Sequence, residues 1–185
     1  MNTDIISAMR KPLLLTALSF GMFASAAAAQ TTSGALKITS PAFANGASIP
    51  IKYACDGDKL NPALVFSGVP GGAKSLALII DDPDVPKTMI PSGEFVHWLV
   101  WDIPPASKGI PEADPTAAAK GLNGTGKPGY YPPCPPDREH RYFFKLYALD
   151  TMLGGAKITN KADLLAAMKG HTVAQAELMG KYKKK

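Results

Sequence analysis

A proline-rich loop followed by a strand-like pattern constrains the fold of this chain most. Residues 130–147 read YYPPCPPDREHRYFFKLY. Four of the first seven residues are prolines, which lack a backbone N–H and fix φ, so this half is neither a helix nor a central strand. The second half alternates as a strand does, and one face carries His140, Tyr142, Phe144, Leu146 and Ala148. We expect a stiff loop that delivers an imidazole and a phenol side by side to a binding site; the alternative is a proline-braced turn with core aromatics.

The first 29 residues have the pattern of a secretory signal peptide. Two basic residues precede an almost entirely apolar run at residues 13–26, and three alanines stand before Gln30. The run is short for a membrane span, and no later segment approaches spanning length. We expect cleavage near Ala29-Gln30 and a periplasmic or secreted protein without a membrane-spanning segment. The alternative is an uncleaved membrane anchor.

Residues 30–185 have the length of one domain with a substantial core. They contain 18 basic and 14 acidic residues, and four lysines among the last five residues account for this whole excess of charge. A lysine run of this kind is more typical of a solvated tail than of an arm that binds nucleic acid. The rest of the domain has no basic stripe interleaved with aromatic residues. We therefore expect a single domain that does not bind nucleic acid.

Two cysteines, Cys55 and Cys134, both stand beside turn-rich sequence. In an oxidising compartment an even pair favours a disulfide. This bridge would close a loop of 79 residues, which is worth roughly 4 kcal/mol in a chain-entropy model. The alternatives are a metal site, for which paired ligands nearby are missing, and two buried free thiols.

The remaining pattern predicts short strands between turn residues. We expect strands at residues 49–53, 63–66, 76–80, 95–101, 141–149 and 172–182. The run at 76–80 is continuously apolar, as in a strand buried on both faces. One helix is expected at residues 161–169, with Asn160 as its cap and Gly170 at its end. Residues 103–136 form a long proline- and glycine-rich connection without a comparable signal, which is typical of a functional or a disordered segment. The pattern predicts an all-β sandwich with a short helix near the C-terminus.

Chemically useful side chains occur in three places: a DPDVP loop, a His-Trp pair and a His-Arg-Tyr triplet. The strand of His97 can pair with the strand that ends at Asp82, and the proline loop can place His140 against both. Imidazole N–H and phenol O–H groups suit phosphate or carboxylate oxygens, and an aspartate can orient one imidazole. A His-Asp general base is an alternative, but no nucleophile motif accompanies it. The spacing is not that of a zinc site.

The order of D-P-D-x-P, H-W and P-P-x-x-x-H-R-Y resembles the phosphatidylethanolamine-binding protein (PEBP) family, in particular the bacterial Raf-kinase-inhibitor-like proteins of the YbhB/YbcL type. The resemblance covers nearly all of residues 30–185. It implies a sandwich of two antiparallel sheets with a small anion-binding pocket at one end. The implied pocket residues are Asp82, His97, His140 and Tyr142, with Asp84 and Pro86 in support.

Two departures from the family pattern concern the pocket. Where family members often carry a glycine before the His-Arg-Tyr triplet, this chain has Arg138, which would either reach over the pocket mouth or face solvent. Residues 123–126 lack the aromatic residue common there. The function expected is that of an exported, non-enzymatic protein that binds phosphate or a phosphorylated head group without a cofactor or metal. It would act as an inhibitor or modulator of an unknown partner protein, and a homodimer is compatible; the alternative is a small hydrolase or isomerase.

Overall fold

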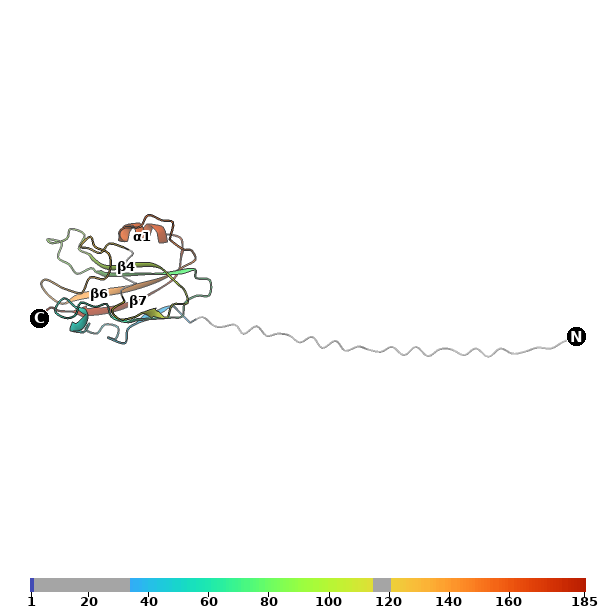
Figure 1. Ribbon diagram of the computed structural model, residues 1–185, viewed down its shortest axis with the longest axis horizontal. Coiled ribbons are helices and arrows are strands. Elements are labelled where there is room, and N and C mark those ends of the chain that lie inside the picture. Colours follow the sequence, from blue (N-terminus) through green and yellow to red (C-terminus); the bar gives the residue numbers. More distant parts are fainter. Residues whose placement is uncertain (2–33, 115–120) are drawn as a thin grey trace. The chain divides into compact units, whose positions relative to one another are not determined.

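The protein is described here by a computed structural model that covers Met1, residues 34–114 and residues 121–185. Two antiparallel sheets face each other (Figure 1). The smaller has the strand order β1 (Lys37–Thr39), β2 (Leu64–Ser67) and β5 (Gly109–Ile110). The larger has the order β4 (Phe95–Ile103), β3 (Ser75–Asp82), β6 (His140–Leu149) and β7 (Thr172–Tyr182). Helix α1 (Lys161–Met168) follows β6. The predicted sandwich with one late helix is confirmed.

Strand β3 is buried along its whole length because both faces of the larger sheet are covered. Leu78 and Ile80 point into the core between the two sheets. Ala77 and Ile79 point the other way, into a second core that includes Leu164 of α1. This arrangement explains the continuous apolar run at residues 76–80, since a strand covered on both sides has no polar face. Every residue of β3 is buried, the two terminal aspartates included.

Helix α1 begins where its sequence predicts. The side chain of Asn160 accepts a hydrogen bond from the backbone of Asp163, and the Asp163 carboxylate accepts one from the Asn160 backbone. This reciprocal capping box satisfies two donors that a helix start leaves unpaired. Leu164 and Met168, four residues apart, pack on the larger sheet. The apolar spacing and the cap together fix the position of the helix.

The strand predicted at residues 49–53 is wrong. Residues Ile51–Tyr53 form a single 3₁₀ turn, labelled η1, in which the Tyr53 amide donates to the Pro50 carbonyl. Pro50 has φ of −58° and no amide hydrogen, so it begins a turn more readily than it continues a sheet. The short strands β1 and β5 were not predicted. Strand β5 has two residues and lies inside the connection at residues 103–136, of which 115–120 lie outside the described residues.

Four strand ends meet at one end of the larger sheet. Asp82, the last residue of β3, pairs with Phe95, the first residue of β4. His140, the first residue of β6, pairs with Tyr182, the last residue of β7. The predicted pairing between the strands of Asp82 and His97 is therefore confirmed. The loops at residues 83–94 and 121–139 connect to these strand ends, and the predicted site residues lie there.

The predicted signal peptide, residues 1–29, lies outside the described residues except for Met1. Within residues 34–114 and 121–185, no helix combines the length and apolar character needed to cross a bilayer.

Candidate functional site

A cavity of about 200 Å³ opens at this end of the larger sheet. Two of the six predicted site residues, Asp82 and His97, line it directly. The remaining lining is mostly apolar or aromatic: Val85, Met89, Ile90, Phe95, Tyr131, Cys134 and Pro136. A larger hollow of about 420 Å³ lies over the outer face of β6 and β7. One of its lining groups, Lys145, is already paired with the buried carboxylate of Asp81. We therefore take the smaller cavity as the candidate site.

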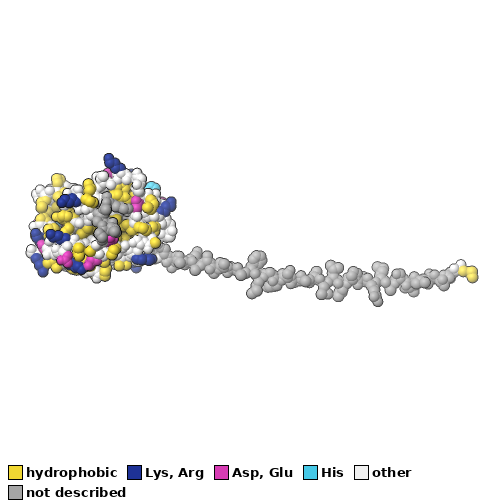
Figure 2. Space-filling model, in the orientation of Figure 1, with side chains coloured by type: hydrophobic (Ala, Val, Ile, Leu, Met, Phe, Trp, Pro, Cys, Tyr) yellow, Lys and Arg dark blue, Asp and Glu magenta, His cyan; other side chains and the backbone are white. Residues whose placement is uncertain are grey.

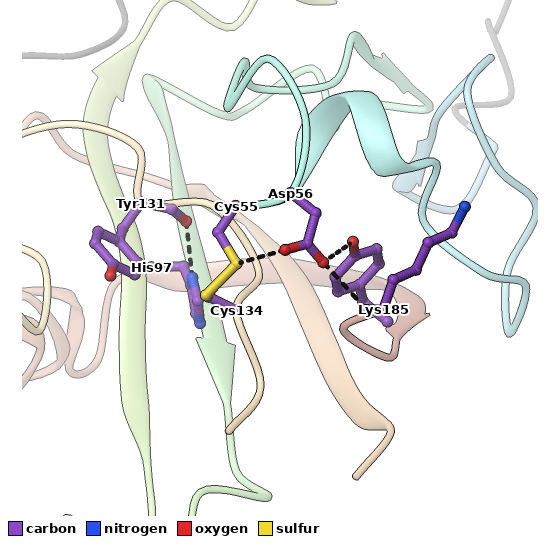
Figure 3. The surroundings of a disulfide bond; sticks show 7 residues. Cys55, Asp56, His97, Tyr131, Cys134 and Lys185 are labelled. Atoms are coloured by element: carbon purple, nitrogen blue, oxygen red, sulfur yellow. Dashed lines mark hydrogen bonds between the residues drawn. A yellow bond between two sulfur atoms is a disulfide. The ribbon is translucent and has the colours of Figure 1, made fainter. Parts of the chain in front are cut away.

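His97 presents a hydrogen-bond acceptor to the cavity. Its Nδ1 atom lies 2.7 Å from the backbone oxygen of Tyr131 (Figure 3), and because a carbonyl oxygen only accepts, Nδ1 carries the hydrogen. Burial lowers the pKa of His97 to about 4, so the ring is neutral near pH 7. Nε2 then holds a lone pair and has no hydrogen-bond partner within the described residues. A ligand that faces this atom must donate a hydrogen.

Asp82 is the second polar group in the cavity wall, and it is only 2% exposed. Its Oδ1 accepts the backbone amide of Asp84 at 2.8 Å, and its Oδ2 lies 2.7 Å from Nδ1 of His140. Burial raises the pKa of Asp82 above the usual range, while the two hydrogen bonds act in the opposite direction. The carboxylate therefore adds a further acceptor to the cavity.

His140 lies behind Asp82, outside the cavity lining, and its side chain is fully buried. Its Nε2 atom lies 2.8 Å from Oδ1 of Asp137. Each ring nitrogen therefore faces a carboxylate oxygen, and both must carry hydrogen when both carboxylates are ionised. The imidazole is thus held between the carboxylates of Asp82 and Asp137. The hydrogen bond from His140 lowers the pKa of Asp137.

Tyr142 packs behind His97, with its ring edge-on to the imidazole at 5.1 Å between centroids. Its residue is 1% exposed, and burial raises the pKa of the phenol well above its usual value. The phenol oxygen lies near the backbone amide of Cys134 but forms no hydrogen bond of ordinary geometry within the described residues. A buried hydroxyl without a partner is costly. Tyr142 thus keeps a free donor directly behind the cavity.

Asp84 and Pro86 hold the loop that forms one wall, and neither lines the cavity. Asp84 accepts three hydrogen bonds from Arg141: from Nε at 2.8 Å, Nη2 at 2.7 Å and the backbone amide at 3.0 Å. This fork lowers the pKa of Asp84 to about 2. The Pro86 carbonyl accepts the amides of Met89 and Ile90, which makes the turn that brings both side chains to the cavity.

Arg138 bridges two loops beside the cavity without lining it. Its Nη1 lies 2.9 Å from Oδ2 of Asp137, and its Nη2 lies 3.3 Å from the backbone oxygen of Asp84. The side chain is 59% exposed. Of the two alternatives for this residue, the side chain faces solvent and does not line the cavity, and its guanidinium also ties the two loops together.

Sequence reasoning did not identify the aromatic wall of the cavity. Phe95 stands two residues before His97 on the same face of β4, and its ring lies 4.8 Å from the imidazole. Tyr131 lies 5.2 Å from Phe95. The i, i+2 relation to His97 could have indicated Phe95. Within residues 123–126, a Cβ at Gly124 would lie 2.5 Å from the Phe95 ring, so a larger residue there would have to displace this ring.

The disulfide is present, as predicted. Cys55 and Cys134 are bonded with their Cα atoms 5.3 Å apart, and the Cys55 amide donates to the Pro133 carbonyl at 3.0 Å. Figure 3 shows the bridge beside the hydrogen bond between His97 and Tyr131. Because Cys134 belongs to the cavity lining, the bridge fixes the proline-rich loop against the site.

Metal ligation is not a feature of the described residues. In residues 34–114 and 121–185, no three His, Cys, Asp or Glu side chains come together in a way that could hold a metal ion.

Residues 39–183 match the profile of the family described as "Phosphatidylethanolamine-binding protein". This chain belongs to the PEBP family.

Similar proteins from other organisms match this chain over most of its length. A UPF0098 protein of Chlamydia trachomatis is 48% identical over 149 residues, which cover 80% of this chain and 99% of the relative. A UPF0098 protein of Methanothermobacter thermautotrophicus is 44% identical over 155 residues, which cover 80% and 99%.

Two solved PEBP structures resemble the fold. The crystal structure of a PEBP homolog from Chlamydia trachomatis has a TM-score of 0.78 and 48% identity, and it covers 82% of this chain and 99% of its own. Escherichia coli YbcL, described as a member of the mammalian PEBP family, has a TM-score of 0.71 and 29% identity, with 82% and 100% covered. The predicted family is confirmed, and this chain is a binding protein of PEBP type by family.

Proposed function

We propose that this protein is exported and binds a small oxyanion, phosphate or a phosphorylated head group, in the cavity of Asp82 and His97, without a catalytic step. The observation that supports this most is the combination of groups there. His97 and Asp82 line the cavity and offer acceptors, while the buried hydroxyl of Tyr142 lies behind His97, outside the lining. A phosphoryl group in its singly protonated form is an anion that still carries a P–OH donor for these acceptors.

The proposal specifies the protonation state of the bound ligand. Two acceptors in the cavity wall would repel a fully ionised phosphate, but a P–OH group can donate to Nε2 of His97 or to Asp82. A phosphomonoester loses this hydrogen with a pKa of about 6. Binding is therefore expected to weaken as the pH rises, through ionisation of the ligand rather than of His97.

The lining gives weaker support to a hydrolase or isomerase. The Asp82–His140 pair has the geometry of a general-base dyad. Both nitrogens of the fully buried ring are, however, already engaged by carboxylates. The described lining contains no serine or threonine, and its one cysteine is in the disulfide. Binding, with modulation of a partner protein as a consequence, is the function we favour.

Export is a further part of the proposal. The signal-like residues 1–29 and the disulfide both support an oxidising compartment, since such bridges persist there and are rare in reducing cytosol. Asp82, His97, His140 and Tyr142 remain the proposed ligand-binding set, with the first two in contact with the ligand.

Calorimetry with methyl phosphate and dimethyl phosphate, at pH 5.5 and pH 8, tests the proposed ligand. Methyl phosphate should bind at pH 5.5 and lose about tenfold or more in affinity at pH 8. Dimethyl phosphate has one negative charge but no P–OH at either pH, so it should bind weakly at both. Equal affinity for the two esters would contradict the donor role of P–OH, and no binding of either would contradict the anion site.

A further inference from the structure

A second cleft of about 190 Å³ lies next to the candidate site. Its lining consists of Pro135, Pro136, Asp137, Arg138, Lys183, Lys184 and Lys185. Pro136 lines both the cleft and the cavity, so the two hollows are neighbours that share this residue. The chain of contacts from Asp82 through His140 to Asp137 also leads from one hollow to the other. The cleft is therefore part of the surroundings of the site.

The lysines are held at this position by the fold. Strand β7 ends at Tyr182 opposite His140, so the next three residues emerge at the same end of the sheet as the cavity. Oδ2 of Asp56 then accepts the Tyr182 hydroxyl at 2.9 Å and the Lys185 amide at 3.2 Å. Asp56 adjoins the disulfide, as Figure 3 shows. The three lysines are exposed, as expected of a solvated segment, while the backbone of Lys185 is held by Asp56 beside the proline loop.

Positive charge exceeds negative charge in this cleft. The ammonium groups of Lys183, Lys184 and Lys185 have no ion pair or hydrogen bond within the described part of the chain. The one acidic side chain in the lining, Asp137, is shared by His140 and Arg138. Even if a chain-end carboxylate at Lys185 is counted, basic groups outnumber acidic ones. In Figure 2, separate lysine or arginine and acidic side chains lie among apolar and other side chains at the end of the domain where Figure 1 places the C-terminus.

We infer that the cleft holds a second anionic group of the ligand, so that the ligand is a small molecule with two phosphoryl groups, or one phosphoryl and one carboxylate, on a short linker. This inference rests on the proposed function, in which the first group occupies the cavity. Arg138 is already bound to Asp137 and to the Asp84 backbone, so the second group is met by lysine point charges. Such charges tolerate several anion shapes, and the linker length sets the selectivity.

The test compares methyl phosphate with ethane-, propane- and butane-bisphosphate by calorimetry at pH 5.5. The wild type should bind at least one bisphosphate about tenfold more tightly than methyl phosphate. The triple variant Lys183→Gln, Lys184→Gln, Lys185→Gln should lose this gain and keep its affinity for methyl phosphate within about twofold. High salt should reduce the gain, since it screens exposed charges.

A matched control removes three other lysines. Lys37, Lys74 and Lys108 are exposed and line neither the cavity nor the cleft, and their change to glutamine alters the net charge by the same amount. This control should keep the tenfold gain, and loss of the gain there would overturn the inference because the effect would be one of net charge. Bisphosphates that bind no more tightly than methyl phosphate would also overturn it, while leaving the proposed function intact. Absence of methyl phosphate binding would instead reject the proposed function. It would also reject the inference that the cavity and the cleft bind one ligand together.

Discussion

The Nδ1 atom of His140 lies 2.7 Å from Oδ2 of Asp82, and neither side chain is more than 3% exposed. These residues are 58 positions apart in the sequence. The sheet joins them because β3 and β6 are hydrogen-bonded neighbours that run in opposite directions, so the end of one meets the start of the other. The contact ties the floor of the cavity to the proline-rich loop.

Removal of His140 should reduce stability more than it alters the cavity surface. His140→Ala leaves the buried carboxylate of Asp82 without its ionic partner, which typically costs about 3 kcal/mol. Urea unfolding at pH 7 measures this loss. His171→Ala is the matched control, because His171 forms a similar 2.8 Å contact with Asp150 but both side chains are 48% exposed. That change should cost less than about 1 kcal/mol, and an equal loss in both variants would contradict the special role of burial.

Acid should weaken the fold through His97. An unfolded histidine titrates near ~6.5, while burial holds the pKa of His97 at about 4. Between these values the unfolded chain binds the proton and the folded chain does not, so stability falls as the pH drops from 6.5 to 4. The full effect is about 3 kcal/mol.

The variant His97→Gln separates this effect from other titrations. Its amide can still donate to the Tyr131 carbonyl but does not titrate, so its stability should change less between pH 6.5 and 4 than that of the wild type. Unfolding curves at several pH values provide the measurement, and His171→Gln is the matched control at an exposed histidine. Parallel profiles for wild type and His97→Gln would show that His97 titrates normally.

The fork between Asp84 and Arg141 should contribute stability over a different pH range. The pKa of Asp84 is about 2 in the folded protein and about 3.8 without its partner. A lowered carboxyl pKa stabilises the fold above about pH 3.8, and this contribution is lost as the pH falls through 2. Asp84→Asn should therefore cost about 1–2 kcal/mol at pH 7, with the difference from wild type vanishing near pH 2. Asp150→Asn, an exposed pair member, should show a smaller difference at pH 7.

The sequence predicts strand positions where periodicity is strong and fails where a turn residue overrides it. The apolar run before Asp82 and the alternation around His97 locate β3 and β4 because burial imposes these patterns. Residues 49–53 look equally apolar, but Pro50 lacks the amide that a strand would use, and a 3₁₀ turn forms. Strand β5 has two residues, too few for any periodicity.

For the site, the order of the motifs predicts which residues gather at one end of the sheet. It does not predict which of them line the cavity and which lie behind it. Alternation along β6 predicts that His140 and Tyr142 face the core, and both are buried. Both residues lie behind Asp82 and His97 because of the twist of the sheet and the paths of the loops. No local sequence pattern encodes either of these. The cavity wall was missed for the same reason, since Met89 and Tyr131 reach it from loops.

The disulfide should support both the fold and the cavity. Replacement of Cys55 and Cys134 by serine removes a link across 79 residues, which is worth roughly 4 kcal/mol in the chain-entropy model. Because Cys134 lines the cavity, the same variant should bind methyl phosphate more weakly even at temperatures where it is fully folded. Thermal unfolding and calorimetry on the double variant measure the two effects. Full ligand affinity in the folded variant would show that the proline loop keeps its place without the bridge.

Expression of the whole chain in a bacterium with an oxidising periplasm should yield a protein that begins near Gln30. The three alanines before this residue fit the small-residue pattern that signal peptidases cleave, and the bridge between Cys55 and Cys134 can form only after the chain reaches that compartment. N-terminal sequencing of the periplasmic fraction and thiol titration of the denatured, unreduced protein test the two steps separately. The expected result is a start near Gln30 with no free thiol. Retention of Met1 in a membrane fraction would favour an uncleaved anchor, and two titratable thiols would show that the bridge does not form in the cell.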